Sequence, residues 1–137
     1  MYISAIFDCF DSVVPGLAMY TNTQASLCVK AIKNAITAYS ELLRDIIHSN
    51  CGSQYTSTKY CKTISHYHII QRMNRVGERC HDNARCESIW VRMKEELFYG
   101  RYSPKQLDQI KQMIWRFFLA IGITAEYALP MVDFLPW

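Results

Sequence analysis

The spacing of hydrophobic positions changes several times along the chain, and each change predicts a new element. Two apolar runs, Tyr2–Phe10 and Val13–Tyr20, flank the polar pair Asp11 and Ser12, which predicts a β-hairpin. Pro15 has no amide hydrogen to donate to a neighbour, so we expect the second strand at a sheet edge. Two shorter apolar runs predict further strands, Asp45–His48 and His68–Met73.

Other segments repeat their apolar residues at intervals of three and four, or follow capping residues, which predicts helices. These helices run from about Thr23 to Leu43, from about Thr56 to Ser65, from the cap at Asp82 and Asn83, and from Ser103 and Pro104, where Gln106 completes a capping box. The last two bury the stripes Cys86, Ile89, Trp90, Met93, Leu97 and Leu107, Ile110, Ile114, Phe117. The order of elements predicts a mixed α/β domain with one sheet, helices packed on it, and a parallel strand pair.

Composition and charge narrow the class of protein. With 137 residues, 50% hydrophobic and 13% aromatic, the chain is long and apolar enough for one folded domain. The formal charge is +3, and the segment from Arg72 to Lys94 alone carries an excess of +3. Its cations form a candidate phosphate-binding surface; the alternative is a solvated charged face, and the charge pattern leaves both open. The candidate DNA-binding residues are Arg72, Arg75, Arg79, Arg85, Arg92 and Lys94.

The cysteines suggest neither disulfides nor a metal. No secretory signal precedes the six cysteines, so we expect reduced thiols in a cytoplasmic protein. A zinc site from Cys61, His66, His68 and Cys80 is disfavoured because these spacings contain no close C-x-x-C pair. The apolar run from Phe117 to Ala125 is far shorter than the ~20 residues of a membrane span, so we expect no membrane association.

One stretch points to a functional edge. HSNCGSQYTS, from His48 to Ser57, turns from apolar to polar directly after a predicted strand. The side chain at its centre, Asn50, is a neutral amide. The stretch is therefore either a site, the remains of one, or a turn.

Three stretches together resemble the catalytic core of insertion-sequence transposases, which belong with the retroviral integrases. They are YISAIFDCFDSVVPGLAM, IIHSNCGSQYTSTKY and RMNRVGERCHDNARCESIWVRMKEELF, and the D-N-A-x-x-E-S core from Asp82 to Ser88 is the most specific part. The similarity runs from about Tyr2 to Phe118. It implies a partial catalytic core over residues 1–119, a ribonuclease H-like mixed sheet with helices on both faces, and DNA as the substrate.

The resemblance also implies a metal site. Such enzymes hold two Mg²⁺ or Mn²⁺ ions on three carboxylates, since phosphoryl transfer needs a nucleophile activated and a developing charge stabilised. Glu87 matches the third carboxylate, and Asn50 stands where the second aspartate is expected. The first aspartate has no counterpart, because Asp8 aligns with a non-catalytic position. We therefore expect Glu87 and the degenerate Asn50 to bind a metal only weakly.

The same resemblance predicts a gap in the sheet. The strand order of this fold is 3-2-1-4-5, and the chain begins inside the second strand, so we expect the central first strand to be missing. Strands Tyr2–Phe10 and Asp45–His48 would then flank an empty place. Residues 120–137 do not resemble the family and read like its next segment translated one base out of frame.

Three functions follow from these expectations. The first is a remnant of a transposase core that is inactive by itself. The second is a non-catalytic DNA-binding or oligomerisation module that modulates intact transposase subunits, nucleoid-associated when bound to DNA. The third and weakest is a residual nuclease that uses Glu87, Asn50 and a borrowed carboxylate.

Overall fold

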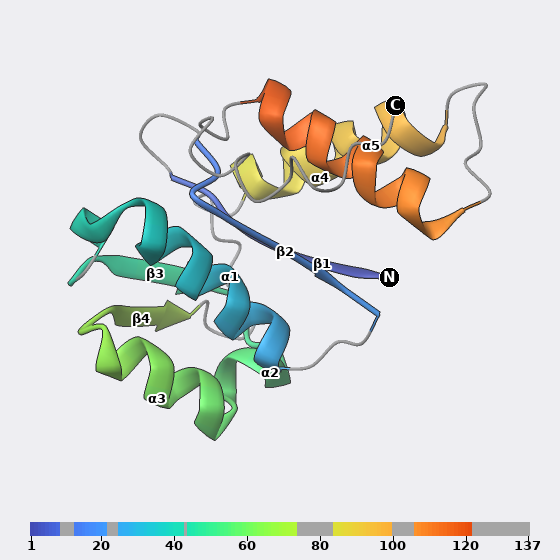
Figure 1. Cartoon of the computed structure of the whole chain (residues 1–137). Coiled ribbons are helices and arrows are strands. Elements are labelled where there is room, and N and C mark those ends of the chain that lie inside the picture. The colour runs from blue at the N-terminus through green and yellow to red at the C-terminus, as the bar shows by residue number, and fades with distance from the viewer. Residues whose placement is uncertain (9–12, 22–24, 43, 74–83, 100–105, 122–137) are drawn as a thin grey trace. The chain divides into compact units, whose positions relative to one another are not determined.

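The computed structural model describes residues 1–8, 13–21, 25–42, 44–73, 84–99 and 106–121 (Figure 1). Their elements are β1 Tyr2–Ile6, β2 Gly16–Tyr20, α1 Ala25–Ala38, the 3₁₀ turn η1 Ser40–Leu42, β3 Ile46–Ser49, α2 Ser53–Thr56, α3 Thr58–His66, β4 Ile70–Met73, α4 Ala84–Phe98 and α5 Leu107–Ala120. The mixed α/β class is confirmed. Two compact units divide the chain, the first made of Met1–Ile6 and Pro15–Cys80, the second of Phe7–Val14 and His81–Trp137.

The first two strands form the predicted antiparallel hairpin, with Tyr2 opposite Tyr20 and Ile6 opposite Gly16. Both strands are shorter than predicted. The second one begins only at Gly16, so Pro15 precedes it. Pro15 has no amide hydrogen to give to the ladder, which accounts for a start after it. The end of the first predicted strand, Cys9 and Phe10, lies outside the described residues.

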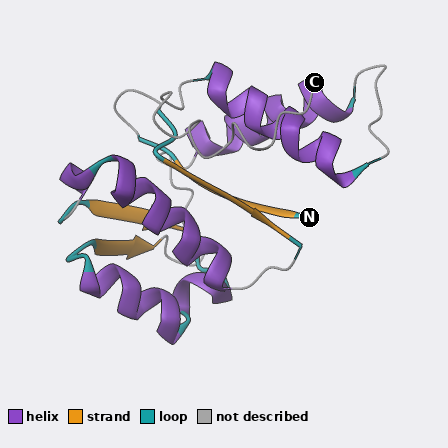
Figure 2. Ribbon diagram, viewed as in Figure 1, coloured by secondary structure: helices purple, strands orange, loops and turns teal. Residues whose placement is uncertain are grey.

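Strands β3 and β4 are parallel, with Ile46 opposite Ile70 and Ser49 opposite Met73. Parallel strands need a crossover, and α2 and α3 supply it. The prediction of a single sheet is wrong for the described residues, whose strands pair as two separate two-stranded sheets (Figure 2). The helix predicted from Thr56 to Ser65 is also divided, because Ser57 adopts an extended conformation between α2 and α3.

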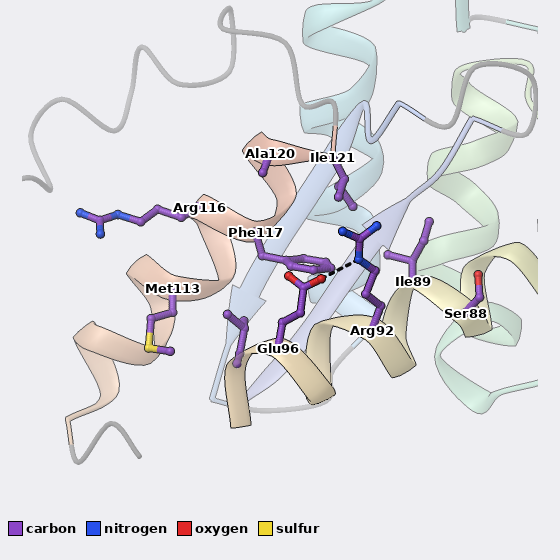
Figure 3. A pocket seen from close by; sticks show the side chains of 10 residues that line it. Ser88, Ile89, Arg92, Glu96, Met113, Arg116, Phe117, Ala120 and Ile121 are labelled. Carbon is purple, nitrogen blue, oxygen red and sulfur yellow. Dashed lines mark hydrogen bonds and ion pairs between the residues drawn. The ribbon is translucent and has the colours of Figure 1, made fainter. Parts of the chain in front are cut away.

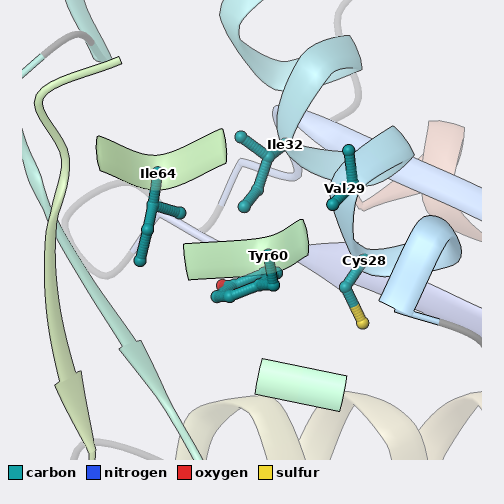
Figure 4. Packing of buried hydrophobic residues seen from close by; sticks show 5 residues of the cluster. All are labelled: Cys28, Val29, Ile32, Tyr60 and Ile64. Atoms are coloured by element: carbon teal, nitrogen blue, oxygen red, sulfur yellow. The ribbon is translucent and has the colours of Figure 1, made fainter. Parts of the chain in front are cut away.

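Helix α1 joins the two sheets of the first unit into one core. Cys28, Val29 and Ile32 from α1 meet Tyr60 and Ile64 from α3 (Figure 4). Ile6 of β1 and Ile47 of β3 pack against this same cluster. The helix ends at Ala38 instead of the predicted Leu43, and η1 follows it.

Close approach of β2 to α1 depends on Gly16. A Cβ atom there would collide with the backbone carbonyl oxygen of Ala31 and lie 2.9 Å from the Cβ of Ala35. The side-chain amide of Asn34 on α1 donates to the carbonyl oxygen of Leu17, 2.9 Å away. Strand and helix are therefore fixed by contact and by a hydrogen bond.

In the second unit, aromatic rings pack edge to face. The Phe7 and Trp90 centroids lie 5.9 Å apart, and those of Trp90 and Phe118 lie 5.8 Å apart. Met93 and Ile114, from the sequence stripes that predicted burial, are buried as well.

Two details of the last helix differ from prediction. Gln106 is the N-cap residue of α5 instead of a residue inside its first turn, and its side chain makes no capping bond. The capping box with Ser103 stays a prediction. Leu107 was expected in the core but is 42% exposed, because it begins the first turn. The caps predicted at Asp82, Asn83, Ser103 and Pro104 lie outside the described residues, as does the tail beyond Ile121. None of the described helices combines the length and the apolar character needed to cross a membrane.

Candidate functional site

The carboxyl ends of β3 and β4 meet at one edge of their sheet, because Ser49 stands opposite Met73 in a parallel pair. In α/β proteins this edge is where ligands bind. Asn50 follows Ser49 directly and is exposed. Its side-chain oxygen Oδ1 accepts a hydrogen bond from the Gly52 amide at 3.0 Å. The amide thus closes an Asx turn on its own backbone, a local role typical of asparagine.

A second set of hydrogen bonds fixes the loop that follows. Gln71 Nε2 donates to the Tyr55 carbonyl oxygen at 2.9 Å and to Ser49 Oγ at 3.4 Å. Ser57 caps α3, since its Oγ accepts from the Tyr60 amide at 3.3 Å and donates to the Gln54 carbonyl oxygen at 2.9 Å. Neither Gln71 nor Ser57 was predicted from the sequence to have such a role. A serine before a helical pattern was the available signal for Ser57, whereas nothing local marked Gln71.

The donor groups at this edge do not suit a divalent cation. Mg²⁺ prefers anionic oxygen ligands, yet the sequence from Ile46 to Met73 contains no aspartate or glutamate. Asn50 offers only a neutral oxygen, and the Gly52 amide already uses it. Within the described residues, His, Cys, Asp and Glu nowhere gather in a group of three.

Glu87 lies in the first turn of α4, in the second unit, and is exposed. A carboxylate is favourable there because it faces the positive end of the helix dipole. Asn50 belongs to the first unit. The two predicted metal ligands thus lie in different units, and their joint coordination stays a prediction.

The predicted DNA-binding residues are only partly described. Arg72 is exposed on β4, in register with His48 of β3. Arg92 Nε on α4 is 2.6 Å from Glu96 Oε1, and Lys94 is exposed two positions further on. Residues two apart do not share a helix face, so Arg92 and Lys94 do not form one surface. Arg75 and Arg79 lie outside the described residues, as does the side chain of Arg85.

Three of the four residues weighed for zinc are described. Cys61, His66 and His68 are all exposed. His68 has a left-handed φ of 56° and ends α3: its amide donates to the Ser65 carbonyl oxygen, and the Ile69 amide donates to that of Ile64. This is a Schellman termination, which gives His68 a role in chain reversal. Cys80 lies outside the described residues.

The described cysteines are Cys28, Cys51, Cys61 and Cys86, and all are reduced thiols. Burial raises the pKa of the Cys28 thiol, and hydrogen bonds with the side chains of Ser4 and Tyr55 lower it in part. Burial also raises the pKa of the Tyr60 hydroxyl. Both groups belong to the core and not to the β3 edge.

The second unit contains a groove of about 690 Å³ between α4 and α5 (Figure 3). Its lining is mainly apolar, with Ile89, Met113 and Phe117, while the Arg92–Glu96 pair stands among them. It contains no group of acids, bases or nucleophiles arranged for a reaction.

Comparison with known proteins relates the chain to transposases. It is 31% identical over 102 residues to a probable transposase for insertion sequence element IS1353 of Shigella flexneri. The aligned residues cover 74% of this chain and 20% of that protein. It is 26% identical over 102 residues to transposase InsF for insertion sequence IS3A of Escherichia coli (strain K12), covering 74% of this chain and 35% of the relative.

The chain therefore spans about a fifth to a third of the length of these curated relatives. No family model matches it. Over most of its length, the chain is homologous to transposases of insertion sequences.

Proposed function

We propose that the chain is part of a ribonuclease H-like transposase core that does not cut or join DNA by itself. The observation that carries this proposal is Asn50. It stands at the carboxyl edge of a parallel strand pair, where the resemblance expects a metal-binding aspartate, and its oxygen is bound to the Gly52 amide.

The pairing of the strands supports this fold. The family order 3-2-1-4-5 leaves two pairs, 3-2 and 4-5, on either side of its central strand. The described strands pair in the corresponding way, β2 with β1 antiparallel and β3 with β4 parallel. Ile6 and Ile47 reach the same core cluster from the two pairs. Both pairings and the shared core cluster are those that a ribonuclease H-like fold predicts.

Weak metal binding follows from the donor groups. Hydrolysis or transfer of a phosphodiester through Mg²⁺ or Mn²⁺ requires carboxylates that hold the ions in place. Glu87 is the one carboxylate that the resemblance assigns to the site. A neutral Asn50 cannot replace an aspartate, because it adds no charge to offset the desolvation of the cation.

The test is a DNA cleavage assay with Mg²⁺ and with Mn²⁺. We expect no metal-dependent cleavage from the chain, and none from Asn50→Asp, because one carboxylate is still lacking. Cleavage that disappears in Glu87→Gln would contradict the proposal and establish the residual nuclease. A gain of cleavage in Asn50→Asp would show that the other ligands are already in place.

A second candidate is a DNA-binding or assembly module that modulates intact transposase subunits. The observation that favours it is the exposure of Arg72 and Lys94, for which no ion pair with a described carboxylate exists. Such a module would act in the cytoplasm, on the nucleoid. DNA binding that decreases steeply with salt, and weakens in Arg85→Ala/Arg92→Ala/Lys94→Ala, is the expected result. A folded chain without such binding would remove this candidate.

A further inference from the structure

Helix α3 has two faces of opposite character. Tyr60 and Ile64 are 1% and 5% exposed and belong to one buried cluster with residues of α1 (Figure 4). The outward positions are all polar or thiol-bearing and all exposed: Thr58, Lys59, Cys61, Lys62, Ser65 and His66. Tyr60 and Ile64 on the buried face pack in the core, whereas the side chains of the outer face do not contribute to it.

Two lysines and a histidine of this outer face form one row. Lys59, Lys62 and His66 are three and four positions apart, which places them on the same side of the helix. At 1.5 Å per residue the row is about 10 Å long. That length corresponds to roughly three nucleotides of a DNA strand at about 3.4 Å each.

Nothing in the surrounding sequence neutralises this row. No aspartate or glutamate occurs between Ile46 and Met73. Neither Lys59 nor Lys62 makes an ion pair with a described carboxylate. His66 lies in the last turn of α3.

The same face is hollowed. A shallow depression of about 600 Å³ is lined by Thr56, Thr58, Cys61, Lys62, Ser65 and His66. Hydroxyl groups and a lysine are the side chains that position phosphate oxygens in protein–DNA complexes. An apolar protein segment would find no matching surface here.

We propose that the outer face of α3 binds the phosphate backbone of DNA through Lys59, Lys62 and His66, with Thr58 and Ser65 as hydrogen-bond donors. The inference rests on the proposed function, because DNA is the partner that function supplies. It adds a contact surface outside the segment from Arg72 to Lys94. The proposed contact is not specific for DNA sequence, because contacts with the phosphate backbone do not distinguish the bases.

The experiment measures binding of the full chain to a labelled 20-base-pair duplex across a series of salt concentrations. The test variant is Lys59→Gln/Lys62→Gln. The matched control is Lys30→Gln/Lys33→Gln, which removes the same charge from exposed positions of α1 in the same unit. Glutamine and lysine have similar helix propensity, so thermal stability of both variants is expected to stay unchanged.

We expect the slope of log K against log salt to become smaller by about 2 in the test variant and to stay unchanged in the control. Binding should weaken equally for duplexes of different sequence. Equal effects of both variants would mean that only net charge matters, and would overturn the proposal. Wild-type-like binding of the test variant would overturn it while leaving the proposed function intact.

Two further outcomes separate the alternatives. If the wild-type chain binds no DNA at any salt concentration, both this inference and the DNA-binding candidate fail. If polyglutamate displaces DNA from the wild-type chain as effectively as unlabelled duplex does, and loses this ability in the test variant, the face serves an acidic protein and the assignment to DNA is wrong.

Discussion

The two units differ in whether their exposed cations form ion pairs. In the second unit, Arg92 lies 2.6 Å from Glu96, and Lys111 lies 3.8 Å from Asp108. In the first unit, the exposed cations of α3 and β4 have no described carboxylate within ion-pair distance. A charge count along the sequence therefore does not show which cations are paired with a carboxylate. It placed the whole excess between Arg72 and Lys94, although part of that charge is paired on its own helix.

The cores differ as well. The second unit is packed around the rings of Phe7, Trp90 and Phe118. The first unit instead buries two titratable groups, the Tyr60 hydroxyl and the Cys28 thiol, in one cluster with Val29, Ile32 and Ile64. We therefore expect the first unit to respond to pH and to backbone substitutions in ways that the aromatic cluster does not.

Removing the central ring of each core gives the largest expected effect. Tyr60 is 1% exposed in the first unit and Phe118 is 0% exposed in the second. Tyr60→Ala and Phe118→Ala should each destabilise their own unit by about 3–5 kcal/mol, because a large cavity replaces the ring. Hydrogen exchange of the amides of α1 and α3, against those of α4 and α5, measures this. Equal loss of protection in both sets from either substitution would contradict the division into two cores.

A smaller effect is expected at Gly16. In Gly16→Ala the new Cβ meets the backbone carbonyl of Ala31, which cannot move without α1, so we expect a loss of about 1–3 kcal/mol. Gly52→Ala is the matched control, since its Cβ would meet only the flexible Gln54 side chain. Urea unfolding of both variants measures the difference. If Gly16→Ala proved as stable as the control, the contact between β2 and α1 would be looser than described.

Periodicity predicted most elements, because each buries one face of a regular pattern. It predicted the α1 stripe with Cys28, Val29 and Ile32, and the hairpin of β1 and β2. It missed the break at Ser57, since a capping hydroxyl inside a helical pattern has no effect on hydrophobic spacing. It also predicted one sheet instead of two pairs of strands. The hydrophobic pattern of a strand does not indicate which other strand lies next to it.

The candidate site was predictable in part. The polar stretch after a predicted strand singled out Asn50, and β3 does end at Ser49, directly before it. Its role in a site stays a prediction. The hydrogen bond to the Gly52 amide was not foreseen. Neither was the role of Gln71, because a polar residue in a short strand indicates nothing about the loop it contacts across the sheet.

Alkaline pH should distinguish the two cores next. Burial raises the pKa of Tyr60, so the folded state keeps the proton while the unfolded state loses it near pH 10. The contribution of Tyr60 to the free energy of unfolding is fully present below that pH. It decreases as pH rises above it, by up to about 1.4 kcal/mol per pH unit. Tyr60→Phe should remove most of this decrease in stability. The part that remains should come from the Cys28 thiol. An unchanged pH profile in Tyr60→Phe would assign the decrease to another group.

The end of α3 offers an effect of the opposite sign. His68 holds a left-handed φ of 56°, which costs a non-glycine residue about 1 kcal/mol. His68→Gly should therefore stabilise the first unit by roughly 0.5–1 kcal/mol, partly offset by the larger entropy of the unfolded chain. Arg44→Gly, at the other positive φ of 75°, is the parallel test. A lower melting temperature in His68→Gly would mean that the imidazole makes a stabilising contact of its own.

The smallest effect tests the difference in charge pairing. Glu96→Gln removes the partner of Arg92 on an exposed helix, so we expect a loss of only about 0.2–0.5 kcal/mol. It also frees a cation, and the salt dependence of DNA binding should become steeper by about 0.9 if Arg92 then reaches a phosphate. Glu95→Gln removes the same charge from the neighbouring position, which has no ion pair with a described residue. A steeper slope in Glu96→Gln alone would mean that the ion pair with Glu96 keeps Arg92 from a phosphate of the DNA. Equal slopes in both variants would mean that release of Arg92 from its ion pair adds no contact with a phosphate.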